Sequence, residues 1–121
     1  MKKVFVSQPM SKYTDDQIRQ NRNMAISILA EFFKLSNQME FEVIDNIQET
    51  NPDIEKLPHK NLGYLANDIR DMANADMAFF MNDWENARGC RIEHRCCEES
   101  NIPILYERDA LFFISSVKDK Q

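Results

Sequence analysis

The sequence predicts a single α/β domain whose mainly parallel sheet carries helices on both faces. Four short apolar segments alternate with amphipathic segments along the 121 residues, and this order places helices between parallel strands joined by right-handed crossovers. Residues 77–81 (MAFFM) are apolar without alternation, which is typical of a strand covered on both faces. We therefore expect one domain over residues 1–121, with a sheet of four or five strands.

Local signals place the elements in order. The predicted strands cover residues 3–7, 41–44, 77–81 and 102–106, and two of the predicted helices cover about 62–74 and 87–100. Residues 14–17 (TDDQ) have the form of a capping box, so a helix of about five turns begins at Asp15. Residues 51–59 contain two prolines and predict a loop with room for one short turn. The apolar tail at 111–117 is too short to assign as strand or helix.

The element order is that of a flavodoxin-like, or Rossmann-like, domain. In such sheets ligands bind beyond the carboxyl ends of the strands, where the strand order reverses. For a flavodoxin-like order this point lies between the first and third strands, so we expect the functional site in the loops at 7–12 and 82–89.

Composition excludes several classes of function. Fifteen basic and twenty acidic residues give a net charge of −5, which disfavours a nucleic-acid partner. Only two glycines are present, too few for a Gly-rich dinucleotide or phosphate loop. No apolar run approaches the roughly 18 residues of a membrane span, and we expect neither a membrane anchor nor a secretory signal.

The cysteines favour a reducing compartment. Cys90, Cys96 and Cys97 form an odd, clustered set, which indicates reduced thiols in a cytoplasmic protein. Cys90, His94 and Cys97 share one helical face and could offer soft ligands to zinc, but a closed structural site needs four ligands. We expect thiols that pack against the sheet and no bound metal.

The segment after the third strand carries the strongest candidate for chemistry. Gly89 allows close approach of a ligand to the start of a helix, whose free N–H groups favour an anionic or polar group. Glu93 lies one turn further on and could point into the same pocket. A carboxylate beside a sugar ring can attack the anomeric carbon and carry a covalent glycosyl intermediate. On spacing alone, the alternative is a solvated acid on a helix surface.

Three segments carry a family resemblance: residues 4–11 (VFVSQPMS), 72–76 (MANAD) and 84–94 (WENARGCRIEH). They resemble a bacterial and phage family related to nucleoside 2-deoxyribosyltransferases, and the resemblance extends from about residue 3 to residue 106. In that superfamily a glycine is followed four residues later by a nucleophilic glutamate, and Gly89 and Glu93 match this spacing. A second superfamily acid corresponds to Asp68, where it contacts the deoxyribose or helps to protonate the leaving base.

The resemblance implies cleavage or exchange of the N-glycosidic bond of a (deoxy)nucleoside or its monophosphate. It implies an enzyme, either a deoxyribosyltransferase or an N-glycoside hydrolase, that needs no metal or organic cofactor. It also implies a homodimer or higher homo-oligomer, because resembling enzymes complete their pockets across subunits. The surfaces that we expect at such a contact are Tyr64, Trp84 and the tail at 111–114.

Further residues of the two loops are candidates for binding the substrate. They are Ser7, Gln8, Pro9, Met10, Tyr13, Asp83, Trp84, Arg88, Gly89 and Cys90. Arg88 and Arg91 could hold a 5′-phosphate with help from Ser7, and Tyr13 and Trp84 could stack on a base or pack between loop and sheet. Gln8 could pair with a base edge or satisfy the loop backbone.

The sequence also departs from the family pattern. Residues 87–88 (AR) stand where the transferases usually carry another acid, and Gln8 stands where many relatives have glycine. The alternative prediction is therefore a non-catalytic module that binds or senses a nucleotide on the same fold.

Overall fold

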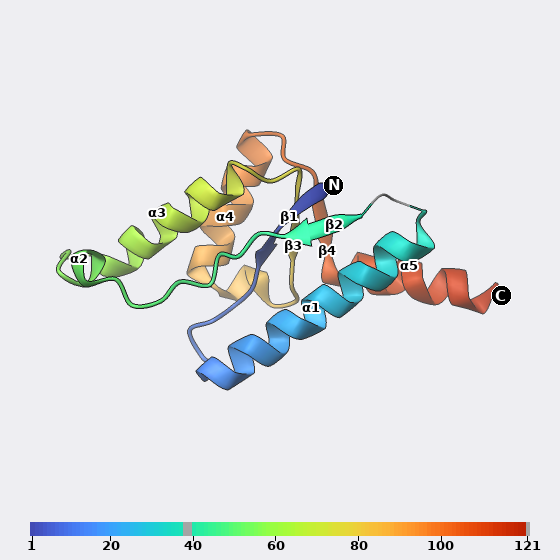
Figure 1. The fold of residues 1–121 in the computed structure, drawn as a ribbon, viewed down its shortest axis with the longest axis horizontal. Coiled ribbons are helices and arrows are strands. Elements are labelled where there is room, and N and C mark those ends of the chain that lie inside the picture. Colours follow the sequence, from blue (N-terminus) through green and yellow to red (C-terminus); the bar gives the residue numbers. More distant parts are fainter. Residues whose placement is uncertain (38–39, 121) are drawn as a thin grey trace.

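The computed structural model describes residues 1–37 and 40–120 and contains a four-stranded sheet in which all described strand pairs are parallel. The strand order is β2-β1-β3-β4, as in flavodoxin-like domains (Figure 1). The strands are β1 (Lys2–Ser7), β2 (Phe41–Val43), β3 (Met77–Phe80) and β4 (Ile104–Tyr106). The predicted α/β class and parallel sheet are confirmed, with four strands.

Helices connect the strands as the element order predicts. They are α1 (Asp15–Leu35), α2 (Pro52–Glu55), α3 (Lys60–Met72), the 3-10 turn η1 (Trp84–Asn86), α4 (Arg88–Glu99) and α5 (Glu107–Asp119). Helix α1 begins where the capping box predicts, because Thr14 Oγ1 accepts from the Gln17 backbone N–H and Gln17 Oε1 accepts from that of Thr14. Among the described residues, no helix combines the length and the apolar character needed to cross a membrane.

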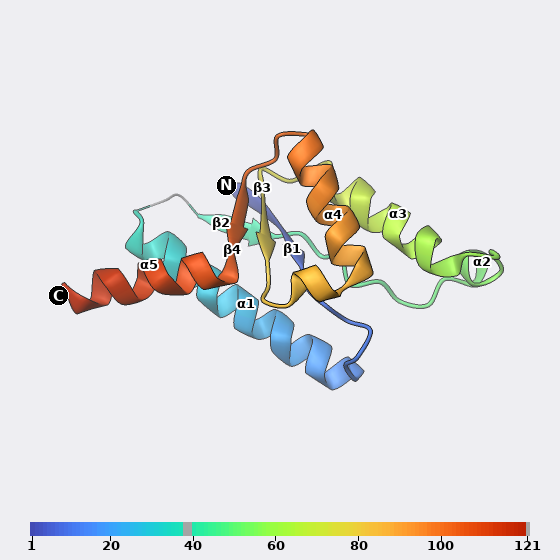
Figure 2. The same cartoon turned by 180° about the vertical axis from the view of Figure 1, so that it is seen from behind.

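The sheet separates two apolar layers. Alternate strand residues such as Val4, Val6 and Phe79 pack against α1 and against Ala110 of α5. The intervening residues Phe5, Ala78 and Phe80 pack with Met72 at the end of α3 and Cys97 of α4. Helices α1 and α5 therefore cover one face and α3 and α4 the other (Figures 1 and 2). Both faces of β1 and β3 are covered, as their apolar sequences predict.

The short turn allowed for in residues 51–59 is helix α2, and the unassigned tail is part of a helix. Asn51 Oδ1 caps the N-terminus of α2 by accepting from the backbone N–H of Asp53 and Ile54, with Pro52 as the first helical residue. The apolar tail belongs to α5, which begins at Glu107, four residues before the apolar run. Its inward stripe consists of Ala110, Phe113, Ile114 and Val117, all buried or half-buried. The helical period is visible only when Ala110 is counted with the tail.

Candidate functional site

A cavity of about 360 Å³ lies at the carboxyl end of β1, and we call it the first cavity. Its walls come from the loop after β1, the segment after β2, and helices α3 and α4. The polar and charged groups on these walls include Gln8, Asn46, Tyr64, Asp68, Arg88 and Glu93. The cavity therefore lies beside the strand-order reversal between β1 and β3, where the topology predicts a ligand.

Glu93 is the buried acid of this cavity, with a side chain that is only 5% exposed. Ser7, the last residue of β1, donates a hydrogen bond from Oγ to Glu93 Oε1 at 2.7 Å. The bond joins positions 86 residues apart and fixes one carboxyl oxygen against the end of the sheet. The Ser7 hydroxyl is thus committed to Glu93 and does not lie free for the predicted contact with a phosphate.

Asp68 of α3 lies against Glu93, and the two carboxyl groups share a hydrogen bond. The pKa of Glu93 is raised to about 8: burial is the largest cause, the Ser7 hydroxyl acts in the opposite direction, and the neighbouring Asp68 acts in the same direction as burial. Burial also raises the pKa of Asp68, whereas its hydrogen bonds with Gln48 and Glu93 lower it. Two acids in contact cannot both ionise cheaply away from water, so near neutral pH the pair holds one proton between them.

A side-chain amide from the segment after β2 holds Asp68 in place. Gln48 Nε2 donates to Asp68 Oδ1 at 2.9 Å and to the Tyr64 carbonyl at 2.7 Å. Gln48 Oε1 accepts from Asn67 Nδ2 at 3.0 Å, which fixes the orientation of the amide. Asp68 is therefore positioned by a residue 20 positions away in the sequence.

The start of α4 forms the wall opposite α3. Ala87 occupies the N-cap position in an extended conformation and supplies no side-chain cap, so the first backbone N–H groups of α4 depend on solvent or a ligand. Arg88 lines the cavity here and is exposed. A Cβ atom added at Gly89 would meet only Leu65 Cδ1 at 3.9 Å, an ordinary contact. Packing within the protein therefore does not require glycine at this position.

Gln8 bonds to helix α1; it neither satisfies the loop backbone nor presents a free amide to the cavity. Its Nε2 donates to the Ile18 carbonyl at 3.1 Å, and its Oε1 accepts from Arg22 Nη1 at 3.4 Å. The buried Arg22 also donates from Nη2 to the Ile44 carbonyl at 2.6 Å, which joins the ends of β1 and β2. Burial lowers the pKa of Arg22, while the charges of Asp45 and Asp68 favour its protonated form.

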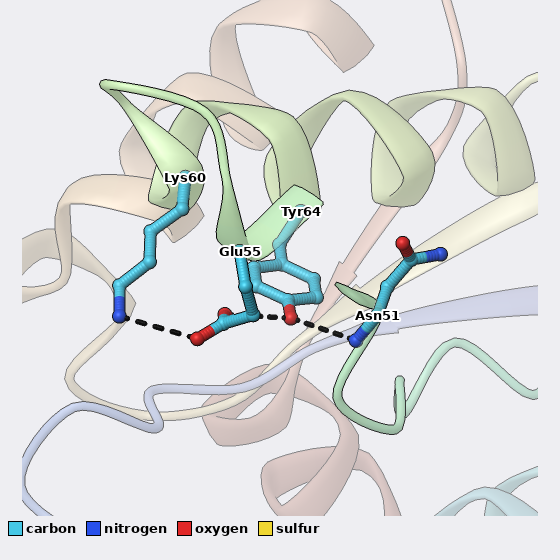
Figure 3. Close-up of polar contacts among 4 residues, drawn as sticks. All are labelled: Asn51, Glu55, Lys60 and Tyr64. Carbon is cyan, nitrogen blue, oxygen red and sulfur yellow. Dashed lines mark hydrogen bonds and ion pairs between the residues drawn. The ribbon is translucent and has the colours of Figure 1, made fainter. Parts of the chain in front are cut away.

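A second cavity of about 570 Å³ adjoins the first and shares with it Met10, Asn46, Tyr64 and Asp68. Tyr64, which lines both cavities, takes part in the polar contacts that Figure 3 shows. The Tyr64 hydroxyl donates to Glu55 Oε2 at 2.8 Å and accepts from the Asn51 backbone N–H at 3.0 Å. Lys60 Nζ lies 3.4 Å from Glu55 Oε1. These contacts hold the connection between β2 and α3 over the two cavities.

The first cavity brings together many of the predicted site residues. They are Gln8, Met10, Asp68, Arg88, Gly89, Cys90 and Glu93, with Ser7 directly bonded to Glu93. Cys90 is buried beside them, and burial raises the pKa of its thiol to about 11. A thiol with this pKa is neutral near pH 7 and is a poor nucleophile.

Other predicted residues lie elsewhere. Pro9, Tyr13 and Asp83 line a separate hollow of about 140 Å³, where the buried Glu107 accepts from both N–H groups of Asn82. Trp84 stacks on His94 with ring centroids 4.0 Å apart, which corresponds to the packing alternative. Arg91 donates from Nη1 to the Glu85 carbonyl at 3.0 Å.

His94 and Cys97, which share the helical face considered for zinc, contact residues of other elements. His94 Nε2 lies 2.7 Å from the Tyr106 hydroxyl, and Cys97 Sγ lies 3.4 Å from Met72 Sδ. The three cysteines are free thiols. The absence of a bound metal stays a prediction.

Sequence reasoning missed Asn46, Gln48 and Tyr64, which line one or both cavities. Asn46 and Gln48 directly follow β2, and in a parallel sheet the carboxyl end of β2 lies at the same edge as that of β1. Polar residues just after the second strand were therefore the available signal. Tyr64 offered no comparable signal, because its role depends on the path of the connection that contains α2.

Comparison with known proteins adds no relative: no family model, no curated protein and no solved structure matches the chain.

Proposed function

We propose that this protein cleaves or exchanges the N-glycosidic bond of a (deoxy)nucleoside or its monophosphate, with Glu93 as nucleophile. The observation that carries the proposal is the pairing of the buried Glu93 with the half-buried Asp68 in the first cavity, with Ser7 bonded to one Glu93 oxygen. A covalent mechanism needs a positioned carboxylate beside a second acid that can supply a proton. The resemblance to nucleoside 2-deoxyribosyltransferases assigns the same roles to the same two residues.

The reaction proceeds in two balanced steps. In the first, with the shared proton on Asp68, the Glu93 carboxylate attacks C1′ and forms a C–O ester bond. The C1′–N bond breaks, its electron pair moves to the base nitrogen, and the base takes the proton of Asp68. In the second, water or another base attacks C1′ and gives up its proton to Asp68. The ester breaks, Glu93 is released, and the configuration at C1′ is retained.

Ser7 and Gln48 act as positioning residues in this mechanism. Ser7 holds one oxygen of Glu93 and favours its ionised form, and Gln48 does the same for Asp68. Their hydrogen bonds leave the proton free to move between the two acids. No step uses a metal or an organic cofactor.

The test is a chromatographic assay over a panel of nucleosides and monophosphates, with and without an acceptor base. Glu93→Gln keeps the shape and removes the nucleophile, so we expect a loss of turnover of about 10³-fold or more with ligand binding retained. Glu99→Gln makes the same change on the exposed end of α4, where Glu99 pairs with Arg95, and should leave the rate unchanged. Mass spectrometry of the quenched reaction should find a glycosyl adduct on Glu93. Undiminished turnover by Glu93→Gln would overturn the proposal.

The second candidate is a non-catalytic module that binds or senses a nucleotide. The raised pKa of Glu93 favours it, because a protonated carboxyl group is a hydrogen-bond donor and not a nucleophile. This candidate predicts a nucleotide that binds tightly to the wild type and is recovered intact. Base release or exchange above the uncatalysed rate would exclude it.

A further inference from the structure

The second cavity is positioned to receive the group that leaves from Glu93 and Asp68. Asp68 belongs to both cavities, and so do Asn46 and Tyr64. A ligand whose sugar lies beside Glu93 in the first cavity can therefore extend past Asp68 into the second. This inference rests on the proposed function, and it concerns the chemical identity of the base.

The two cavities differ in charge. The first is bounded by Arg88 and by the start of α4, where Ala87 supplies no side-chain cap. The lining of the second includes the acids Asp15, Glu49, Glu55 and Asp68 and one cation, Arg19, which lies 3.5 Å from Asp16. The second cavity is therefore the more acidic of the two and favours groups that carry N–H donors.

The wall between the cavities also contains an acceptor without a donor. Asn46 is 5% exposed, and its Nδ2 donates to the Val6 carbonyl at 3.3 Å. Its Oδ1 is buried and has no hydrogen-bond partner among residues 1–37 and 40–120. A buried amide oxygen without a donor is unfavourable, and it is uncommon in folded proteins unless a ligand or water completes it. Asn46 lines both cavities, so a ligand in them lies next to this residue.

The other amide of this wall is already saturated. Gln48 uses both Nε2 protons and its Oε1 within the protein. Of the two side-chain amides that line the second cavity, Asn46 is therefore the one with an unmet group, the acceptor Oδ1, and acidic side chains line the same cavity.

We propose that the second cavity selects a base that carries an exocyclic amino group, with Asn46 as the residue that determines the specificity. Adenine and cytosine carry such a group, whereas hypoxanthine and uracil present a carbonyl at the same edge. A carbonyl would face the acceptor Asn46 Oδ1 without a shared proton. Sites that hydrogen-bond a substrate group discriminate strongly against the analogue that lacks it.

The experiment compares matched pairs, deoxyadenosine with deoxyinosine and deoxycytidine with deoxyuridine, as nucleosides and as monophosphates. Dissociation constants are measured calorimetrically on Glu93→Gln, and kcat/KM is measured on the wild type. We expect a preference of about tenfold or more for each amino member in both measurements. Equal or reversed preference in both pairs would overturn the inference.

Two variants test which residues of the second cavity cause the preference for the amino member of each pair. Asn46→Leu removes the acceptor and should reduce the preference to near unity, even if its overall affinity falls. Should Asn46→Leu fail to fold, Glu49→Gln tests the same wall with an exposed residue and should reduce the preference by about two- to threefold. Glu42→Gln makes the same charge change on an exposed residue of β2 that does not line the cavity, and should preserve the preference. An unchanged preference in both Asn46→Leu and Glu49→Gln would contradict the inference.

The two measurements separate this inference from the proposed function. Turnover without preference between the members of a pair overturns the proposed base specificity and remains consistent with the proposed glycosidic reaction. Selective binding of the amino member without turnover supports the specificity and overturns the reaction. Binding of no member of the panel overturns both.

Discussion

The proton shared by Glu93 and Asp68 makes the proposed activity depend on pH. The pair is competent when it holds one proton, because Glu93 must attack as a carboxylate while Asp68 protonates the base. We expect kcat/KM to fall above about pH 8, where the proton is lost, and to fall in acid, where both groups are protonated. Asp68→Asn removes the acid, so its residual rate should rise with pH instead of falling. A flat profile in the wild type between pH 5 and 9 would contradict the shared proton.

The same proton affects stability with a definite sign. In the folded protein the pair of Glu93 and Asp68 keeps its shared proton up to about pH 8, whereas in the unfolded chain glutamate and aspartate side chains lose theirs near pH ~4. The folded state therefore binds more protons across this interval, and the free energy of unfolding falls as pH rises through it. Glu93→Gln has no such group, so urea unfolding should show it to be more stable than the wild type at pH 8.5 by at least about 1 kcal/mol. That gap should close toward pH 5.

The two glycines provide a matched pair of substitutions. Gly89→Ala meets only Leu65 at an ordinary distance and replaces glycine within a helix, so stability should stay equal or rise by up to about 1 kcal/mol. Its methyl group stands beside the first cavity, and we expect loss of ligand binding. Gly63→Ala would place its Cβ 2.9 Å from Ile54 Cγ2 and Leu57 Cδ1. It should shift the α2–α3 contact and leave activity largely intact. Thermal unfolding and the nucleoside assay distinguish these outcomes.

At the level of single residues, the spacing from Gly89 made Glu93 a candidate, and the resemblance then added Asp68 and the roles of both acids. The 2.7 Å contact of Glu93 with Ser7 spans 86 positions, and no local pattern encodes such a pair. For Tyr13 and Trp84 a local pattern does exist, but it has two meanings. Aromatic residues near a loop predict either stacking on a ligand or packing, and only the position of His94 beside Trp84 shows the packing.

At the level of elements, we expect the uncapped start of α4 to affect both the stability of the protein and its affinity for an anionic ligand. Ala87 has the extended backbone of an N-cap but no side-chain acceptor, so Ala87→Asp should stabilise the protein by about 0.5–1 kcal/mol. The added carboxylate would compete for the N–H groups and repel an anionic ligand. We expect the Kd of a nucleoside monophosphate to rise more than that of the nucleoside. Ala87→Ser adds the cap without the charge and should separate the two effects. Equal changes for both ligands would contradict an anionic group at this helix start.

The positions of most helices and strands could be predicted from the sequence. Thr14 and Gln17 place the start of α1, and both capping hydrogen bonds are present. Helix α5 was not assigned because its apolar residues were judged without Ala110, which completes the inward stripe with Phe113 and Ile114. The walls of both cavities depend on the path of the connection from β2 to α3. That path is fixed by contacts such as the hydrogen bond of Tyr64 with Glu55, and such contacts cannot be predicted from the periodicity of apolar residues in the sequence.

At the level of the whole molecule, alternating apolar and amphipathic segments sufficed to predict the layers. Each strand needs cover on its faces, and helices that follow parallel strands supply it by the shortest right-handed path. The site follows from topology in the same way, because the order β2-β1-β3-β4 reverses beside β1. What topology cannot predict is whether copies of the chain associate, and through which surface. That surface depends on which apolar side chains remain outside the core.

The predicted homo-oligomer can be tested on α5. Phe112 is 74% exposed and Leu111 is 43% exposed, while Phe113 points inward against Phe32 with ring centroids 5.2 Å apart. If copies associate through the tail, light scattering at tens of micromolar should give a mass of two chains or more, and Phe112→Glu should reduce it to that of one chain without lowering the unfolding temperature. Phe113→Ala serves as the contrast, because the loss of a packed aromatic ring should lower the unfolding temperature by several degrees. A wild type that is monomeric at this concentration would contradict the prediction. An oligomer that survives Phe112→Glu would place the contact elsewhere, because a charged side chain at a buried interface without a partner is strongly unfavourable.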